Sequence, residues 1–363
     1  MSHYMEKALE LAKHGQNSVS PNPMVGCVIV KNNTIVGQGY HQRAGEPHAE
    51  IFALRDAKES ARGADVYVTL EPCCHYGRTP PCTSALIQAG VKRVFIACQD
   101  PNPLIASKGI QVLNAAGIET IVGIKEAEAQ QLNKVFFHFI QHKTPFVIAK
   151  WAMSLDGKTI TNTKDDRIIS DEACHAHAHQ TRQIVDAIVI GSKTALLDNP
   201  KLTARASHSI KSIKSIESIE SIEKQPRRIV LSSHGSLPLD LALFSYDLPG
   251  KTIVATTDAI DDSWRKQAEH KNIELWILPQ NKHQQVDLHA LLKKCGKENI
   301  TSLLVEGGET VHQSFMQASL VQEFNVYLSP IWIGHEEKKK FLAPLHCQSL
   351  GASLFIQSGE KIV

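Results

Sequence analysis

The stretches PHAE (residues 47–50) and VTLEPCCHYGRTPPC (residues 68–82) decide how the first half of this chain folds. Proline is tolerated in a first helical turn, and the apolar spacing after it predicts a helix that carries His48 and Glu50 in its opening turn. The apolar residues that open the second stretch predict a strand, and the run TSALIQAG after it predicts a helix that ends at its glycine. Side chains that bind metals and carry protons are therefore expected near the ends of these elements.

The order His48-x-Glu50, then Pro-Cys73, then Cys82 matches the signature of zinc deaminases, except that the second cysteine follows after nine positions instead of three. One His and two Cys leave the fourth tetrahedral position to water, whose pKa zinc brings near neutrality. Cys73 and Cys82 both stand at or just before a predicted helix start, where the helix dipole favours the thiolate that zinc requires. Glu50 lies near the open position without being needed as a ligand, so we expect it to shuttle protons.

A structural zinc site is the main alternative to a catalytic one. A structural site usually closes with four protein ligands, and Cys74 or His75 could supply the fourth. A non-enzymatic alternative is a zinc-stabilised module that only holds nucleotide. That module predicts that the proton shuttle is missing, whereas Glu50 is present, and the catalytic interpretation is therefore favoured.

Composition indicates an ordinary globular protein with more than one domain. The length of 363 residues exceeds the usual prior of roughly 150 residues per domain. Apolar residues make up 42% and charged residues 21%, and no apolar run approaches a membrane span. Eight cysteines without a secretory signal indicate thiols or metal ligands. With a formal charge of +2 and no basic face, we expect a cytoplasmic protein without nucleic-acid or membrane partners.

Strands alternate with helices along both halves, which predicts two α/β domains, residues 1–145 and 146–363. The first domain should open with a helix and then a hairpin that turns at Asn32-Asn33. The second should begin with the strand FVIAKWAMSLDGKT, and a helix should run from about Asp171 to Ile184. The Ser-Ile repeat at residues 208–225 is expected to be a surface insert, because isoleucine at that spacing would spiral round a helix without forming one apolar face.

Seven stretches in order give the chain a family resemblance: SPNPMVGCVIV, PHAE, VTLEPCCHYGRTPPC, CQDPNP, AKWAMSLDGK, LLDNPKLTAR and VEGG. The chain resembles the bifunctional deaminase/reductases of riboflavin biosynthesis over nearly its full length. The resemblance implies a cytidine-deaminase-like α/β/α domain followed by a dihydrofolate-reductase-like α/β domain. A tRNA or nucleoside deaminase fused to an unrelated reductase is the alternative, and it would want a basic and aromatic surface that the sequence lacks.

The resemblance also implies substrates, cofactors and assembly. The first domain would use Zn²⁺ to remove the ring amino group of 2,5-diamino-6-(5-phosphoribosylamino)pyrimidin-4(3H)-one. The second would use NADPH to reduce the ribosyl group to ribityl. The expected partner is thus a small phosphorylated pyrimidine, and a homo-oligomer is expected because members of the family are often dimers or tetramers.

Around the zinc site, the resemblance implies a substrate pocket with two kinds of contact. Five residues are expected to contact the pyrimidine or its ribose, or to border the same pocket: Asn22, His41, His75, Asp100 and Asn102. Arg78 is expected on the 5′-phosphate, because a guanidinium pairs well with phosphate oxygens.

In the second domain the resemblance places Lys150, Asp198 and Glu306 around the ribose and nicotinamide. The cofactor would be bound by Ala152, Ile168, Thr194, Asp198, Ser233 and Gly308. The phosphorylated substrate would be held by Arg182, Leu202, Arg205 and Glu306. Reduction needs the nicotinamide held against the reacting carbon and an acid near the opening ribose ring. Either Lys150 or Glu306 could supply that proton.

One loop departs from the family pattern. Asp166 and Ile168 stand where the resemblance leads us to expect Ser or Thr and then Trp. A carboxylate near a substrate phosphate would be unfavourable, so the contacts of this loop stay open.

Overall fold

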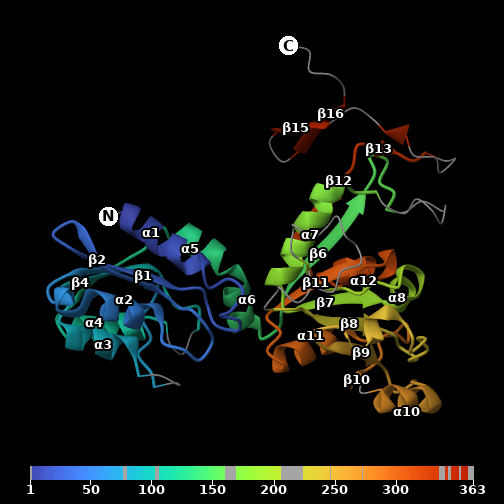
Figure 1. Cartoon of the computed structure of the whole chain (residues 1–363), viewed down its shortest axis with the longest axis horizontal. Coiled ribbons are helices and arrows are strands. Elements are labelled where there is room, and N and C mark those ends of the chain that lie inside the picture. Colours follow the sequence, from blue (N-terminus) through green and yellow to red (C-terminus); the bar gives the residue numbers. More distant parts are fainter. Residues whose placement is uncertain are drawn as a thin grey trace. The chain divides into compact units, whose positions relative to one another are not determined.

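The computed structural model describes residues 2–76, 80–102, 106–159, 169–205, 224–245, 247–271, 273–334, 340–341, 345–350 and 353–358, the last three ranges by their backbone alone. The chain divides into two compact units, residues 1–146 with 291–302 and residues 147–290 with 303–363 (Figure 1). Arg78, Asp166, Ile168 and residues 208–223 of the Ser-Ile repeat lie outside the described residues.

The first unit is built on a five-stranded sheet of order β2-β1-β3-β4-β5. β1 pairs antiparallel with β2 and β3, while β3, β4 and β5 run parallel. Asn32 and Asn33 take φ values of 50° and 61° between β1 and β2, which confirms the predicted hairpin. The strands are β1 (Gly26–Lys31), β2 (Thr34–Tyr40), β3 (Asp65–Leu70), β4 (Arg93–Cys98) and β5 (Glu119–Val122).

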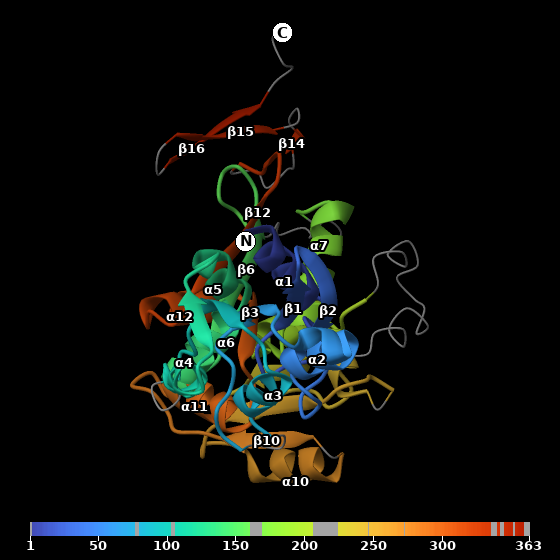
Figure 2. The same ribbon diagram turned by 90° about the vertical axis from the view of Figure 1, so that its left-hand side faces the viewer.

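Helices cover both faces of this sheet, which confirms the expected α/β/α layering (Figures 1 and 2). One face carries α1 (Ser2–Lys13) and α5 (Glu126–Leu132). The other carries α2 (Ala49–Ala57), α3 (Cys82–Ala89) and α4 (Lys108–Ala115). The short helix η1 (Lys58–Ala61) follows α2, and α6 (Lys134–His142), which the sequence did not lead us to expect, ends just before the next strand.

Helix α2 packs on β1 and β2 through a seam of small residues. Ala49, Ala53 and Ala57 recur every fourth position and are buried, as one face of a helix requires. Opposite them are Gly37 and Gly39 on β2, where an added Cβ would lie 2.4 Å from the Ala53 oxygen and 2.6 Å from the Ala53 nitrogen respectively. Backbone therefore meets backbone along the seam, and this contact fixes the depth at which the first turn of α2 lies.

The second unit is built on a seven-stranded sheet of order β10-β9-β8-β7-β11-β6-β12. β10, β9, β8, β7 and β11 run parallel, and β12 runs parallel to β6 at the edge. All five residues of β7 are buried, as expected for a strand covered on both faces. The strands are β6 (Phe146–Met153), β7 (Ala187–Gly191), β8 (Arg227–Leu231), β9 (Thr252–Thr256), β10 (Glu274–Ile277), β11 (Ser302–Gly307) and β12 (Glu323–Leu328).

Some of the helices around this sheet begin at a capping side chain. The predicted helix from Asp171 is confirmed, because the Asp171 carboxylate accepts the Cys174 N–H and caps the first turn. The helices are α7 (Glu172–Ile184), α8 (Ser192–Asp198), η3 (Ala242–Phe244), α10 (Asp262–His270) and α12 (Glu309–Gln317). Helix α11 (Leu288–Lys297) begins in the second unit, and its residues from 291 on belong to the first. Two hairpins follow β12: β13 (Ile331–Trp332) with β14 (Lys340–Phe341), and β15 (Leu345–Leu350) with β16 (Ser353–Ser358).

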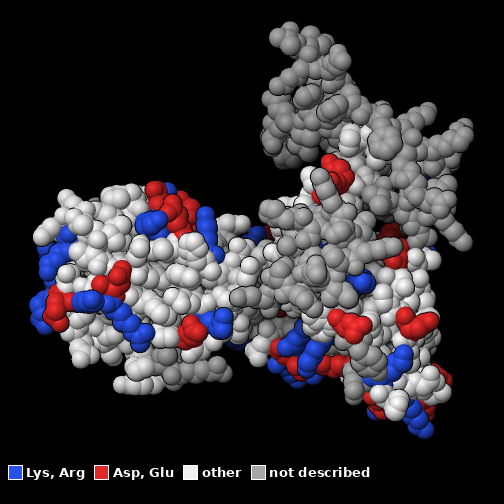
Figure 3. Space-filling model, viewed as in Figure 1, with Lys and Arg blue, Asp and Glu red and all other residues white. Residues whose placement is uncertain are grey.

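Within the described ranges, none of the helices combines the length and the apolar character that crossing a bilayer demands. On the face in Figure 3, basic and acidic side chains are interspersed, and among the residues described there no continuous basic area is visible.

Candidate metal centre and a pocket in the second unit

His48, Cys73 and Cys82 meet on one side of the five-stranded sheet. His48 is the N-cap of α2, Cys73 follows β3, and Cys82 opens α3. The Nδ1 of His48 lies 3.5 Å from the Cys73 Sγ and 3.3 Å from the Cys82 Sγ, and the three ligand atoms lie within 4.8 Å of one another. Tetrahedral zinc, with bonds of about 2.0 Å to N and 2.3 Å to S, holds such atoms roughly 3.5 Å apart. The side chains present therefore fit zinc.

The expectation that Cys73 stands at a helix start is wrong, because residues 71–76 form no helix. The start of a helix nevertheless acts on Cys73. The backbone N–H of Cys82, at the start of α3, donates to the Cys73 Sγ at 3.3 Å. The neighbouring Cys82 thiol and then His48 lower the pKa of Cys73 to about 4, and the Cys73 thiolate in turn raises the pKa of Cys82.

Glu50 lies in the first turn of α2 beside these three ligands. The residue is only 3% exposed, and its Oε2 has no hydrogen-bond partner. Burial, followed by the charge of Cys73, raises the pKa of Glu50 to about 7. A carboxyl group with such a pKa can both accept and release a proton near neutral pH.

The structural alternative required a fourth protein ligand from Cys74 or His75. Among the residues that the structure describes, the metal-binding group contains only His48, Cys73 and Cys82. Cys74 is half-buried and His75 is exposed, and neither joins that group. The geometry thus favours a site with an open position.

Half-buried Asn22 and buried His41 form a pair near the metal centre. The Nδ1 of His41 lies 3.1 Å from the Pro47 carbonyl, which can only accept, so this nitrogen carries the proton. The Nε2 of His41 then accepts from the Asn22 side-chain amide at 3.1 Å. Because His41 is 2% exposed with both ring nitrogens engaged, it orients Asn22 in this structure rather than facing a ligand itself.

Asp100 and Asn102 form a tight turn after β4. The Asp100 Oδ1 accepts the backbone N–H of Asn102 at 2.8 Å, and burial raises the pKa of Asp100. The same segment is bound by Glu71, whose carboxylate accepts backbone N–H groups from Asp100, Ser107, Gly109 and Ile110. The sequence pattern showed Glu71 only as part of the motif around Cys73, since its partners lie some 30 to 40 positions away.

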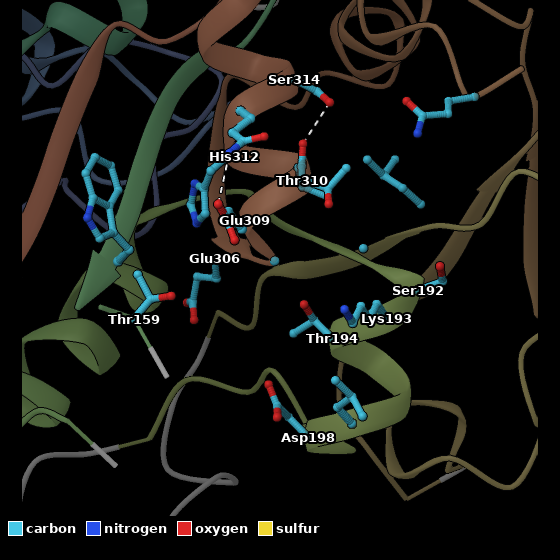
Figure 4. Close-up of a pocket in the computed structure, with 18 of the residues that line it drawn as sticks. Thr159, Ser192, Lys193, Thr194, Asp198, Glu306, Glu309, Thr310, His312 and Ser314 are labelled. Carbon is cyan, nitrogen blue, oxygen red and sulfur yellow. Dashed lines mark hydrogen bonds between the residues drawn. The ribbon is translucent and has the colours of Figure 1, made fainter. Parts of the chain in front are cut away.

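A pocket of about 1890 Å³ opens in the second unit next to the carboxyl ends of β7, β8 and β11. Ligands of open parallel sheets usually bind at such an edge. Figure 4 shows Thr194 and Asp198 on α8, with Glu306 and His312 across the open space. The expected site residues that line the pocket are Lys150, Ala152, Thr194, Asp198, Ser233, Glu306 and Gly308.

Arg182 is not among the residues that line this pocket. It instead forms an ion pair with Glu306, which does line it. Its Nε and Nη2 each donate to the Glu306 carboxylate at 2.6 Å, and its Nη1 donates to the Thr203 carbonyl at 3.1 Å. Burial would raise the pKa of Glu306, but the charge and hydrogen bonds of Arg182, with Lys150 nearby, lower it to about 2. Leu202 is buried and Arg205 half-buried, and neither lines the pocket.

Sequence reasoning missed several residues that line the pocket. His312 is only 9% exposed, its ring lies 5.6 Å from that of Trp151, and its Nδ1 has no hydrogen-bond partner. Burial and then Lys150 lower the pKa of His312. Spacing was the available signal: His312 follows Gly308 by one helical turn, and Trp151 follows Lys150 directly.

Known proteins match nearly all of this chain. Residues 145–355 match the family model of the RibD C-terminal domain, and residues 1–98 match that of the cytidine and deoxycytidylate deaminase zinc-binding region. Riboflavin biosynthesis protein RibD of Actinobacillus pleuropneumoniae is 41% identical over 337 residues, which cover 93% of this chain and 85% of that protein. The RibD protein of Escherichia coli K12 is 40% identical over 93% of this chain and 89% of its own length.

Solved structures resemble both units together. Acinetobacter baumannii RibD, form 1, superposes with a TM-score of 0.80 at 37% identity, covering 96% of this chain and 94% of that one. The diaminohydroxyphosphoribosylaminopyrimidine deaminase/5-amino-6-(5-phosphoribosylamino)uracil reductase of Thermotoga maritima superposes with a TM-score of 0.73 at 31% identity. That match covers 98% of this chain and 97% of the other.

Proposed function

This chain belongs to the RibD family of riboflavin biosynthesis, whose members combine a deaminase with a reductase, and we propose which of its residues carry each activity. The single observation that carries the first assignment is the meeting of three metal-binding atoms within 4.8 Å beside the buried carboxyl of Glu50, whose Oε2 has no hydrogen-bond partner. We assign His48, Cys73 and Cys82 as zinc ligands and Glu50 as the proton carrier. The substrate is 2,5-diamino-6-(5-phosphoribosylamino)pyrimidin-4(3H)-one.

Deamination exchanges a ring amino group for oxygen. Zinc, when held by the three ligands, makes a water acidic enough to act as a nucleophile near neutral pH. Glu50 accepts the proton that this water gives up and passes it to the ring nitrogen. It then carries the proton of the newly added hydroxyl to the amino group, which leaves as ammonia while the carbonyl forms. Its pKa of about 7 suits both directions of transfer.

The substrate ring is held by groups around the metal centre. Asn22, oriented by His41, presents its amide to the ring. The same space is bordered by Asp100, Asn102 and His75. The predicted contact between Arg78 and the 5′-phosphate stays a prediction, because Arg78 lies outside the described residues.

The second activity reduces the ribosyl group in the pocket of the second unit. NADPH, when bound, supplies the hydride. Thr194 and Asp198 on α8, Ser233 after β8, and Ala152 line the space for it. Gly308 is the N-cap of α12, and backbone N–H groups at a helix start suit a phosphate. We propose these four side chains and this helix start as the cofactor site, with Ile168 as a further, untested contact.

Lys150 is the proton donor that the pocket favours. A carboxylate with a pKa of about 2, bound twice by a guanidinium, is a poor acid at neutral pH, so Glu306 is better suited to accept hydrogen bonds from ribose hydroxyls. Lys150 lies on β6 at the same pocket and can protonate the opening ring. Arg182 would hold Glu306 in place, and its predicted contact with the substrate phosphate would require that pair to open.

We extend the proposal to domain limits, assembly and location. Residues 1–145 would carry the deaminase and residues 146–363 the reductase. The edge strand β12 exposes Phe324 (53%) and Val326 (41%), and such apolar edges are usually covered, which supports a homo-oligomer. Free thiols at the described cysteines support a cytoplasmic location, and the interspersed surface charges support a small-molecule partner rather than nucleic acid.

The test separates the two activities. Ammonia release is measured with the diaminopyrimidine phosphate, and NADPH oxidation is measured with its deaminated product, together with the zinc content of the purified chain. We expect about one zinc per chain and both activities. A zinc-loaded chain without ammonia release would contradict the assignment of the first site, and a chain that oxidises no NADPH would contradict that of the second.

A further inference from the structure

Glu71 joins two segments that lie on either side of the deaminase site. It stands between the last residue of β3 and Pro72-Cys73, and it is 5% exposed. Its Oε2 accepts the backbone N–H of Asp100 at 3.2 Å and of Ser107 at 3.0 Å. Its Oε1 accepts those of Gly109 at 2.9 Å and Ile110 at 3.4 Å. One carboxylate thus receives four N–H groups from a different part of the chain.

These contacts use the full accepting capacity of the side chain. A carboxylate offers about four lone-pair positions, and hydrogen bonds to a charged acceptor are roughly twice as strong as neutral ones. Three of the donors belong to the start of α4, whose N-cap Ser107 makes no side-chain cap of its own. Glu71 therefore caps α4 from outside, where the helix dipole favours an anion.

The backbone at Glu71 strengthens the same connection. Its N–H donates to the Cys98 carbonyl at 3.0 Å, which ties the end of β3 to the end of β4. Asp100 and Asn102 follow β4 directly, and Cys73 follows Glu71 by two positions. The side that holds the metal and the side that faces the substrate ring are thereby fixed to each other through one residue.

We propose that Glu71 is a positioning residue of the deaminase: it sets Asp100 and Asn102 at a fixed distance from the metal ligands, and so orients the substrate ring against Glu50. This inference rests on the proposed roles of Asp100 and Asn102. Glu71 itself is not part of the metal-binding group. Its contribution is expected in substrate binding more than in the chemical step, because the reacting groups stay in place without it.

Gly109, in the first turn of α4, offers a second test of the contact between α4 and Glu71. A Cβ on Gly109 would lie 2.1 Å from the Pro72 carbonyl and 3.2 Å from the Glu71 Oε1. Gly109→Ala must therefore push α4 away from Glu71 without changing any side chain of the metal centre.

The experiment measures zinc content, KM and kcat of ammonia release for Glu71→Gln, Glu71→Ala and Gly109→Ala in the full chain. Glu71→Gln keeps one accepting oxygen, so we expect KM to rise about tenfold with kcat within about threefold of wild type and zinc unchanged. Glu71→Ala should raise KM further. Glu59→Gln, an exposed glutamate of the same unit, is the matched control and should leave both constants unchanged.

A double-mutant cycle tests whether Glu71 acts through the substrate-facing segment. In an Asp100→Asn background, Glu71→Gln should raise KM by clearly less than in wild type, because the contact that it positions is already lost. Fully additive effects, an unchanged KM, or a loss of zinc in proportion to activity would overturn the proposal. If Glu71→Gln does not fold, Gly109→Ala decides by the same criteria. Wild-type chain that releases no ammonia would instead refute the deaminase assignment itself.

Discussion

The two sites of this chain are built in opposite ways. The proposed deaminase site concentrates its chemistry in four side chains, with three candidate ligand atoms within 4.8 Å and one buried carboxyl beside them. The reductase pocket spreads its contacts over about 1890 Å³ and over the ends of several strands and helices. Glu306, which lines this pocket, is already ion-paired with Arg182 within the protein.

This difference shows where each site is sensitive. A metal centre needs a few atoms at fixed separations, so one atom changed there should abolish a reaction. A dinucleotide pocket divides binding among many weaker contacts, so single changes should weaken it gradually. The buried ion pair between Arg182 and Glu306 is an exception to this gradual weakening, since its loss should affect the stability of the whole second unit.

Glu50→Gln should have the largest effect. The amide keeps the shape of the side chain but cannot carry a proton, so ammonia release should fall by about 10² to 10⁴ with zinc still bound. Metal content and ammonia release are measured on the same sample, and NADPH oxidation with the deaminated substrate serves as the control. Loss of zinc in this variant would mean that Glu50 is a ligand.

Glu306→Gln should destabilise the second unit by about 3 to 5 kcal/mol, because it leaves the Arg182 charge buried and without its partner. All four tryptophans lie in that unit, so urea unfolding followed by their fluorescence reports on it selectively. Glu269→Gln is the matched control, since the exposed Arg265–Glu269 pair should be worth less than about 1 kcal/mol. Equal losses in the two variants would refute the special role of the buried pair.

Lys150→Ala should lower NADPH oxidation by about 10²-fold, the usual range for a lost proton donor, and leave ammonia release unchanged. The exposed Lys266 on α10 supplies the control substitution. A parallel fall in both activities would contradict the separation of the two sites.

The stabilising contribution of Glu306 should depend on pH. Its pKa is about 2 in the folded chain and near 4.5 when unfolded, so the unfolded state binds more protons as the pH falls. The contribution is therefore complete above about 4.5 and declines as the pH falls toward 2. The difference in unfolding free energy between wild type and Glu306→Gln, measured by tryptophan fluorescence, should be constant from pH 8 to 5 and shrink below. A decline between pH 8 and 5 would show that another group controls the pair.

Cys74→Ser should have the smallest effect, within about 0.5 kcal/mol in stability and without loss of zinc, because Cys74 is not part of the metal-binding group. Cys82→Ser, its counterpart within that group, should lose zinc. The opposite pattern would show that the ligands were assigned to the wrong cysteine.

Sequence reasoning succeeded where the physics is local. The turn at Asn32-Asn33 needs two residues that tolerate positive φ, and the helix cap at Asp171 needs only its own first turn. Part of the metal motif is also local in the sequence, since His48 and Glu50 lie at the start of the same helix. Cys73 was wrongly expected at or just before a helix start, because residues 71–76 form no helix.

Contacts between segments far apart in the chain could not be predicted from the sequence. Arg182 and Glu306 were both named as site residues, yet 124 positions separate them and nothing in either segment indicates that they pair. Glu71 was read only as part of a motif, because its four donors become neighbours only when α4 is packed. The orientation of Asn22 by His41 likewise depends on how the hairpin meets α2.

The seam beneath α2 has a consequence for mutational tolerance. In a library of single substitutions selected for growth without riboflavin, the positions of Gly37, Gly39, Ala49, Ala53 and Ala57 should tolerate almost nothing, although none of them carries a polar side chain. Alanine scanning would detect only the two glycines, because the other three are alanine already. A scan with valine would uncover all five, and so reveal that the position of Glu50 depends on the absence of larger side chains from this seam.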